Sequence, residues 1–327
     1  MKAMTLLRIE WIKTTRRRAF WVTLGFFSLV CTMMIVGDVA TGRRGFGPPF
    51  VAPFGWARAA DQFESMPAFF LSIVVVMLVA SEFSWRTARQ NVIDGLSKEQ
   101  FFAAKTLMLL LVVVAFTVVP FALATSATVY SRIVGPPPPR EVSAAPDSAA
   151  IRAAMRAGSG QNRDSAQAAM RDVMRAIRDR APVFPPPDPD APFVTAADGK
   201  VFGGFVLGSL GIASVAFMLA ATLRSTGGAI GTAFLYFMVV ERAILLLLTR
   251  FTSADTVRAV QPYLPMNAFA APMRPAAWHA AYVERMSVGR PSPVTVDADL
   301  FHLIGVPLLW IAVFIGIAFL DFRRRDL

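Results

Sequence analysis

Six long apolar stretches constrain the fold of this chain more than any other feature of its sequence. A helix that crosses a bilayer needs about 20 mostly apolar residues, because each residue rises about 1.5 Å across a hydrocarbon core about 30 Å thick. The stretches meet or approach this length, and only the fifth contains charged residues. They are 20–37, 66–81, 106–130, 201–223, 225–248 and 300–320. The sequence therefore predicts an all-α integral membrane protein with six transmembrane helices, and it argues against a soluble enzyme.

The distribution of charge predicts how these helices are oriented. The chain has 33 Lys and Arg against 22 Asp and Glu, a formal net charge of +11. With the N-terminus in the cytoplasm, the cytoplasmic segments are 1–18, 82–105, 224–226 and 321–327. Their 52 residues hold 14 bases and 6 acids, whereas the 149 residues of the outer segments hold 18 bases and 15 acids. Because basic residues concentrate in cytoplasmic loops, both termini are predicted to be cytoplasmic.

The same distribution bears on the partners and the location of the chain. A soluble protein this basic would be a candidate for binding nucleic acid, but here the bases are dispersed and flank the apolar stretches. Nucleic acid is therefore not an expected partner, and the lipid bilayer is. We expect a multi-pass protein of the plasma membrane or, in a bacterium, of the inner membrane.

The chain divides into three regions. Residues 1–130 contain a basic N-terminus, the first three spans and a cytoplasmic segment at 82–105. Residues 131–200 form an outer loop with proline runs near both ends, which favour polyproline II geometry without a hydrophobic core. Residues 201–327 contain the last three spans. Within them, the outer segment 250–300 mixes prolines with aromatic residues, which favours short interfacial or re-entrant helices.

Two interpretations of the outer loop remain open. Between its proline runs, Met170, Val173, Met174 and Ile177 recur at i, i+3, i+4 and i+7, which places them on one face of a helix. This spacing favours a helical hairpin that docks an extracytoplasmic partner over 135–200. The high Ala and Arg content is equally compatible with a weakly ordered insertion.

Motifs for chemistry within the chain are absent from the sequence. Gly199 and Lys200 are followed by a valine instead of the Ser or Thr of a phosphate-binding loop. The 52 cytoplasmic residues are too few for a nucleotide-hydrolysing domain, which needs on the order of 100 residues. Neither His279 nor His302 has a Cys or His partner at metal-ligand spacing. We therefore expect no enzymatic activity, no metal and no cofactor bound by this chain.

The cytoplasmic segment 82–105 is predicted to be a rigid finger. Helix-forming residues run to Asp94, and Gly95 stands where a helix commonly ends. Ser97 and Gln100 have the spacing of a capping box, which predicts the start of the helix that leads into span three. A helix, a tight break and a second helix can transmit force between the cytoplasm and the spans.

This finger resembles the coupling segment of the membrane subunits of type II ABC exporters, the ABC-2-type permeases. The matching residues are Glu82 with Phe83, Arg86 with Thr87, the short helix 89–96, and Lys105 at the entry to span three. Three further places are similar to the family: an interfacial elbow at Glu10 to Lys13 with Arg16 to Arg18, a Leu-Pro motif at 263–267, and the C-terminal residues 322–327. The resemblance covers 1–130 and 201–327, whereas the loop 135–200 departs from the compact family plan.

The resemblance implies a permease subunit of an ATP-driven exporter. Separate ABC ATPase subunits would use ATP and Mg, and a second permease subunit, identical or different, would complete the path. The residues expected to contact the ATPase are Glu82, Arg86, Thr87, Arg89, Gln90, Asn91, Asp94 and Lys98. An alternative from another class is a membrane scaffold or sensor that transports nothing and recruits an extracytoplasmic partner.

Span five contains two charged residues, Glu241 and Arg242. Each would cost about 2.5–3.5 kcal/mol near the bilayer centre, so each needs a partner or access to water. Adjacent residues diverge by about 100° around a helix, which argues against pairing with each other. We expect each charge to find its partner on another helix, on a re-entrant segment or in water at the outer interface. A structural role is therefore favoured over a role in the transport path.

Small residues in spans four and five predict close packing of these two helices, because glycines let helix backbones approach each other. The residues concerned are Gly204, Gly208, Gly211, Gly227, Gly228 and Gly231.

Overall fold

The computed structural model describes residues 3–43, 50–84, 97–135, 190–286 and 299–324. Within these ranges the chain is helical and contains no strand. The first half consists of α1 (Ala3–Thr15), α2 (Arg18–Arg43), α3 (Gly55–Phe63), α4 (Met66–Ser84) and α6 (Lys98–Val134). The second half begins with α9 (Ala196–Leu223), α10 (Thr226–Leu235), η1 (Tyr236–Val240) and α11 (Glu241–Phe251). It ends with α12 (Ala254–Val260), η2 (Gln261–Tyr263), α13 (Pro265–Met273), η3 (Pro275–Ala277), α14 (Ala280–Met286), η4 (Phe301–Gly305) and α15 (Val306–Arg324).

The apolar helices agree with the stretches predicted from the sequence. Five segments are long and apolar enough to cross a membrane: Arg18–Ala40, Lys98–Val134, Ala196–Leu223, Thr226–Phe251 and Phe301–Arg324. The remaining predicted stretch, 66–81, lies in α4, which forms a bent pair with α3 at an angle of 68°. Pro67 near the start of α4 lacks a backbone N–H and cannot continue a preceding helix, which accounts for the break. By length and composition, the described residues thus contain five helices that could cross a membrane, or six if the bent pair counts as one span.

Helix α9 occupies the middle of the bundle and packs against α4, α13 and α15. Its small residues let neighbours approach, and its large side chains are almost fully enclosed, as for Phe205 and Phe217 at 2% exposure each. Edge-to-face aromatic contacts join α9 to α6, with Phe121 against Phe205 and Phe102 against Phe217. The core therefore lies along α9, with α2 and the α10–α11 segment at the periphery.

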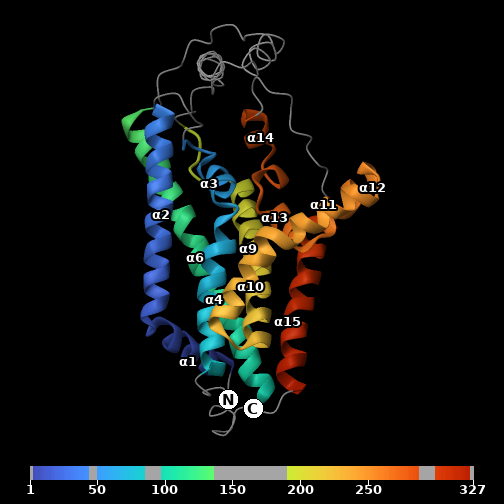
Figure 1. The fold of residues 1–327 in the computed structure, drawn as a ribbon. Coiled ribbons are helices and arrows are strands. Elements are labelled where there is room, and N and C mark those ends of the chain that lie inside the picture. Colours follow the sequence, from blue (N-terminus) through green and yellow to red (C-terminus); the bar gives the residue numbers. More distant parts are fainter. Residues whose placement is uncertain (1–2, 44–49, 85–96, 136–189, 287–298, 325–327) are drawn as a thin grey trace, which may run out of the picture.

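Helix α1 lies across one end of the bundle instead of along it (Figure 1). The chain turns between Thr15 and Arg18, where the indole of Trp21 donates to the carbonyl of Thr15 at 2.6 Å. The C-terminal end of α4, the start of α6 and the end of α15 lie at the same end of the molecule as α1 (Figure 1). This junction end therefore brings together α1, α4, α6 and α15.

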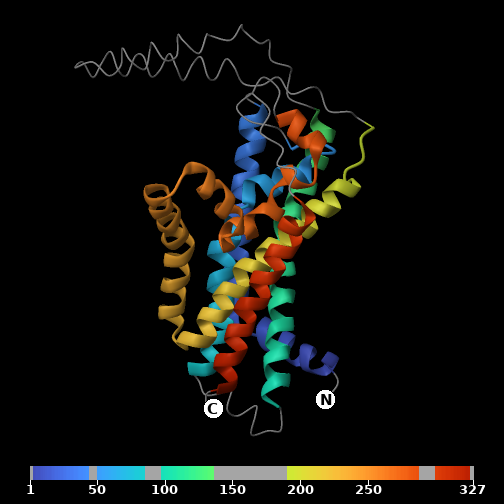
Figure 2. The same cartoon turned by 90° about the vertical axis from the view of Figure 1, so that its right-hand side faces the viewer.

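The segment α10–η1–α11 turns back from α9 and stands apart from the bundle over much of its length (Figure 2). Helix α10 follows α9 after Arg224, which has φ 53°, and the N-cap Ser225. Only 11% of the most apolar window of this span is buried, against 61% for α9. Short helices α12 to α14 then return the chain to the opposite end of the bundle from the junction, consistent with the proline-rich pattern of this segment.

Candidate functional site

Most of the predicted ATPase-contact residues lie outside the described residues. These are Arg86, Thr87, Arg89, Gln90, Asn91 and Asp94. Glu82 is part of α4, and Lys98 is the first residue of α6. The predicted capping box at the start of α6 is confirmed: Gln100 N donates to Ser97 Oγ at 3.1 Å, and Ser97 N donates to Gln100 Oε1 at 3.3 Å. The apolar stripe predicted in the outer loop, which consists of Met170, Val173, Met174 and Ile177, also lies outside the described ranges.

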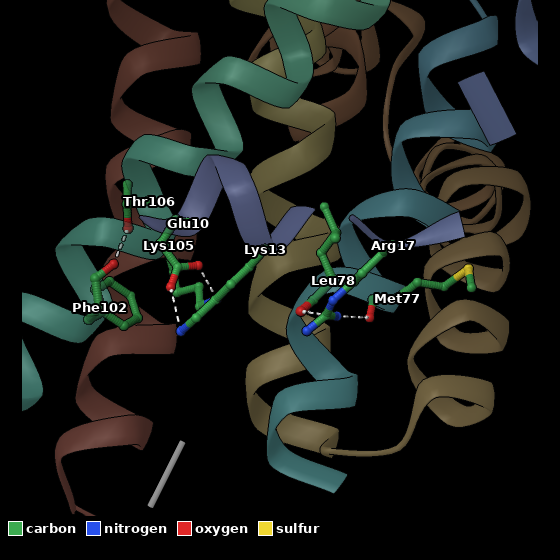
Figure 3. Close-up of polar contacts among 8 residues, drawn as sticks. All are labelled: Glu10, Lys13, Arg17, Met77, Leu78, Phe102, Lys105 and Thr106. Atoms are coloured by element: carbon green, nitrogen blue, oxygen red, sulfur yellow. Dashed lines mark hydrogen bonds and ion pairs between the residues drawn. The ribbon is translucent and has the colours of Figure 1, made fainter. Parts of the chain in front are cut away.

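A buried ion pair ties α1 to α6 at the junction end (Figure 3). Glu10 is 5% exposed, and its carboxylate pairs with Lys105, whose side chain is 10% exposed. Lys13 adds a second contact to Glu10 at 3.4 Å, and Lys105 also lies over the ring of Phe101. Removing one member of such a pair leaves a buried charge without compensation, which typically costs about 3–5 kcal/mol.

The turn between α1 and α2 contacts α4 through Arg17. Its guanidinium donates to the backbone carbonyls of Met77 at 3.4 Å and Leu78 at 3.3 Å (Figure 3). Glu10 and Arg17 thus connect the N-terminal region with both helices that border residues 85–96. The sequence analysis placed Glu10 and Arg17 in the elbow and Lys105 in the finger, and the structure brings these two motifs together.

Aromatic contacts add α15 to this assembly. The ring of Phe322 stacks on Phe101 at a centroid distance of 5.6 Å, and Phe319 meets Phe102 edge-on at 5.2 Å. Four helices are therefore fixed to one another around the start of α6.

The glycines of α9 do pack closely against another helix, but the partner is α13 and not the fifth span. An added Cβ would lie 2.0 Å from the carbonyl oxygen of Pro272 at Gly204, 2.2 Å from that of Phe269 at Gly208, and 2.1 Å from the Phe269 ring at Gly211. In α10, a Cβ at Gly227 or Gly231 would meet no described atom within 4 Å, and one at Gly228 would meet only the cap Ser225. The glycines of α10 therefore do not mediate the predicted contact, and α10 instead buries Ala229 and Ala233.

The intramembrane carboxylate also takes its partner from α13. Oε1 of Glu241 accepts from Met266 N at 2.7 Å and from the Tyr236 hydroxyl at 2.9 Å. The backbone N–H groups at a helix N-terminus are unsatisfied within the helix and attract negative charge. The Leu-Pro motif thus begins α13, and Glu241 binds the end that it exposes. This agrees with a partner on a re-entrant segment; Glu241 and Arg242 form no ion pair in the described structure.

A second polar cluster at the opposite end of the bundle was not indicated by the sequence. Arg58 pairs with Asp38 and, at 3.3 Å, with Asp61, which also accepts from the Tyr282 hydroxyl at 3.4 Å. Burial, reinforced by the nearby Asp61 carboxylate, raises the pKa of Tyr282. The four residues come from α2, α3 and α14, so spacing along the chain carries no signal of their meeting.

Nearby, His279 is buried with its Nε2 atom 4.0 Å from Oδ1 of Asp198. The Nδ1 atom of His279 accepts from the backbone N–H of Tyr282. Among the residues that the structure describes, no group of three or more His, Cys, Asp or Glu side chains is arranged to hold a metal ion.

These features define a multi-pass helical membrane protein whose polar contacts join helices. The chain belongs to the ABC-2 family of transporter proteins, since the sequence model of that family matches residues 65–320. The match begins just before α4 and ends within α15, and so includes the predicted finger, the α9–α13 contact and the Glu241 site. No curated protein sequence matches the chain significantly. The protein is therefore a membrane component of a transporter, the permease type of subunit, and not the ATPase.

Proposed function

We propose that the chain is the transmembrane subunit of an ATP-driven ABC exporter. Two such subunits, identical or different, would form the path, and separate ABC ATPase subunits that use ATP and Mg would bind at the junction end. That end, with both termini, would face the cytoplasm, and six spans would cross the plasma or inner membrane. Family membership and the concentration of bases in the segments at this end support the proposal.

The observation that carries the proposal is the junction around residues 85–96. Helix α6 is tied to α1 through Glu10 and Lys105, and α4 is tied to the turn that follows α1 through Arg17. Helix α6 then runs from Lys98 to Val134, about 55 Å at about 1.5 Å per residue. Closure of the ATPases against the finger would move α4 and α6 as connected bodies and alternate the access of the path.

The test is a charge reversal on the finger. The permease is purified together with its ATPase from the native host and reconstituted in liposomes, and ATP hydrolysis is measured. Arg89→Glu combined with Asp94→Arg is expected to reduce hydrolysis by the complex at least about tenfold while the protein remains inserted. Arg258→Glu, an exposed change on α12 at a distance from the junction, serves as the control. Unchanged hydrolysis in the double variant would contradict the proposed coupling.

A further inference from the structure

A cavity of about 640 Å³ lies where α3 and α4 face α10, η1, α11 and α13. Its wall is part apolar, with Phe69, Phe234 and Phe237, and part polar. The volume falls within the range of about 300–1,000 Å³ that is usual for small-molecule sites. A ligand that complements this wall needs an apolar body and at least one polar group.

The polar part of the wall has acceptors that lack donors. Oε2 of Glu241 is buried and accepts no hydrogen bond of normal geometry from any described residue, although Asn267 lies near the carboxyl group. Glu241 as a whole is 5% exposed. Oε1 of Gln62 is likewise buried without a hydrogen-bond donor in the described structure, and both residues line this cavity. A buried acceptor without a donor costs about 1–3 kcal/mol, more when charged, so both atoms favour a ligand that donates.

The charges around the cavity point to a cation. Three carboxylates line it, those of Asp61, Glu64 and Glu241, against the single guanidinium of Arg242. Asp61 is paired with Arg58, and Glu64 accepts from Arg274 at 2.9 Å, so these two are already compensated. Arg242 is exposed and forms no ion pair with Glu241 in the described structure, so it does not compensate this carboxylate. Glu241 remains as the carboxylate available to a bound cation.

We propose that this cavity binds an ammonium group carried on an apolar body, with Glu241 and Gln62 accepting its N–H groups and the phenylalanines enclosing the apolar part. The site rests on the proposed function, in which it would hold the transported molecule. The same chemistry is offered by a free amphipathic amine and by the headgroup of an amino-phospholipid.

The test uses dansylcadaverine, a fluorescent probe with a primary ammonium on an apolar ring system. The full chain is placed in nanodiscs of phosphatidylcholine, which has no ammonium N–H, and binding is followed by fluorescence anisotropy. We expect the probe to bind at least about tenfold more tightly than its N-acetyl derivative, which keeps the body and loses the charge. Equal affinity for the two probes would overturn the proposal and indicate a hydrated or lipid-filled hollow.

Variants locate the binding. Glu241→Gln keeps an acceptor for Met266 N and Tyr236 but removes the charge, and it should weaken dansylcadaverine at least about tenfold and leave the N-acetyl probe unchanged. Gln62→Leu, a second variant on α3, should weaken binding of the ammonium probe severalfold. Asp255→Asn, an exposed carboxylate on α12, is the matched control and should have no effect. Unchanged selectivity in both cavity variants would refute the site.

Two further arms separate the sources and the hypotheses. Displacement of the probe by phosphatidylethanolamine in the nanodisc identifies an amino-phospholipid as the occupant, and lack of displacement identifies a free amine. The binding assay needs no ATPase, so it can fail while the finger variants still uncouple ATP hydrolysis; the cavity proposal would then be wrong and the proposed function would stand. Conversely, if the probe binds but no ATPase purifies with the permease from the native host, the cavity proposal would stand and the proposed function would be wrong.

Discussion

The junction end and the cavity region differ in how their polar groups are satisfied and in how closely they are packed. At the junction, the charged groups of Glu10, Arg17 and Lys105 are compensated, and the hollow among α1, α4, α6 and α9 amounts to about 20 Å³. Around Glu241, buried acceptors lack donors, and the open volume is about 640 Å³. A closely packed assembly that an ion pair and hydrogen bonds join moves as one body, whereas an unfilled site with unmatched acceptors has capacity to bind. The two regions therefore suit force transmission and ligand binding respectively.

The largest expected effect tests whether the junction depends on its ion pair. Lys105→Met leaves Glu10 buried with only the longer contact to Lys13, and it should destabilise the protein by about 3 kcal/mol, measured by thermal unfolding in detergent. Glu10→Gln combined with Lys105→Met removes the stranded charge and should recover most of that loss. A single variant as stable as the wild type would show that the pair does not hold α1 on α6.

The next effect tests the packing of α9 against α13, the helix that also lines the cavity. Gly208→Ala places a Cβ 2.2 Å from the Phe269 carbonyl oxygen, so α13 must shift, at a cost of about 1–3 kcal/mol. Because Glu241 binds the start of α13, affinity for the ammonium probe should fall as well. Gly231→Ala, where a Cβ meets no described atom within 4 Å, is the matched control. Equal unfolding temperatures for the two variants would argue against close α9–α13 packing.

The smallest effect is expected in the peripheral segment α10–η1–α11. Gly231→Ala itself should change stability by less than about 1 kcal/mol, because it adds helix propensity without a clash. A large loss in thermal stability would mean that this face of α10 contacts something in the assembled protein, for example the second permease subunit. The α10–η1–α11 segment would then be packed in the assembly, as the rest of the bundle is.

Sequence patterns predicted the elements of this fold better than the contacts between them. Apolar length alone located the helices that are long and apolar enough to cross a membrane, and the capping box at Ser97 marked the start of α6, because both are local properties of the chain. The glycines of α9 indicated a face that another helix can approach closely, but not which helix, because α13 lies far beyond α10 in the sequence and spacing carries no signal of their contact. Glu10 and Lys105 are separated by 95 residues, and nothing in their spacing indicates that they meet.

The Glu241 site was predicted in part. The cost of its burial indicated a partner on another segment, but only the fold shows that this partner is the start of α13, at the Leu-Pro motif. The cavity was beyond the sequence altogether, because its wall comes from α3, α4, α10, η1, α11 and α13. The unmatched acceptor of Gln62 likewise becomes visible only when the surrounding donors are placed.

The most direct test of the division of roles is ATP hydrolysis by the reconstituted complex with and without dansylcadaverine, compared between the wild type and Glu10→Gln with Lys105→Met. We expect a ligand in the cavity to stimulate hydrolysis by the wild-type complex. This double variant disrupts the tie between α1 and α6 and leaves the cavity untouched. The account predicts unchanged probe affinity and at least about a tenfold loss of the stimulation. Stimulation equal to that of the wild type, or a loss that follows weakened probe binding, would contradict it.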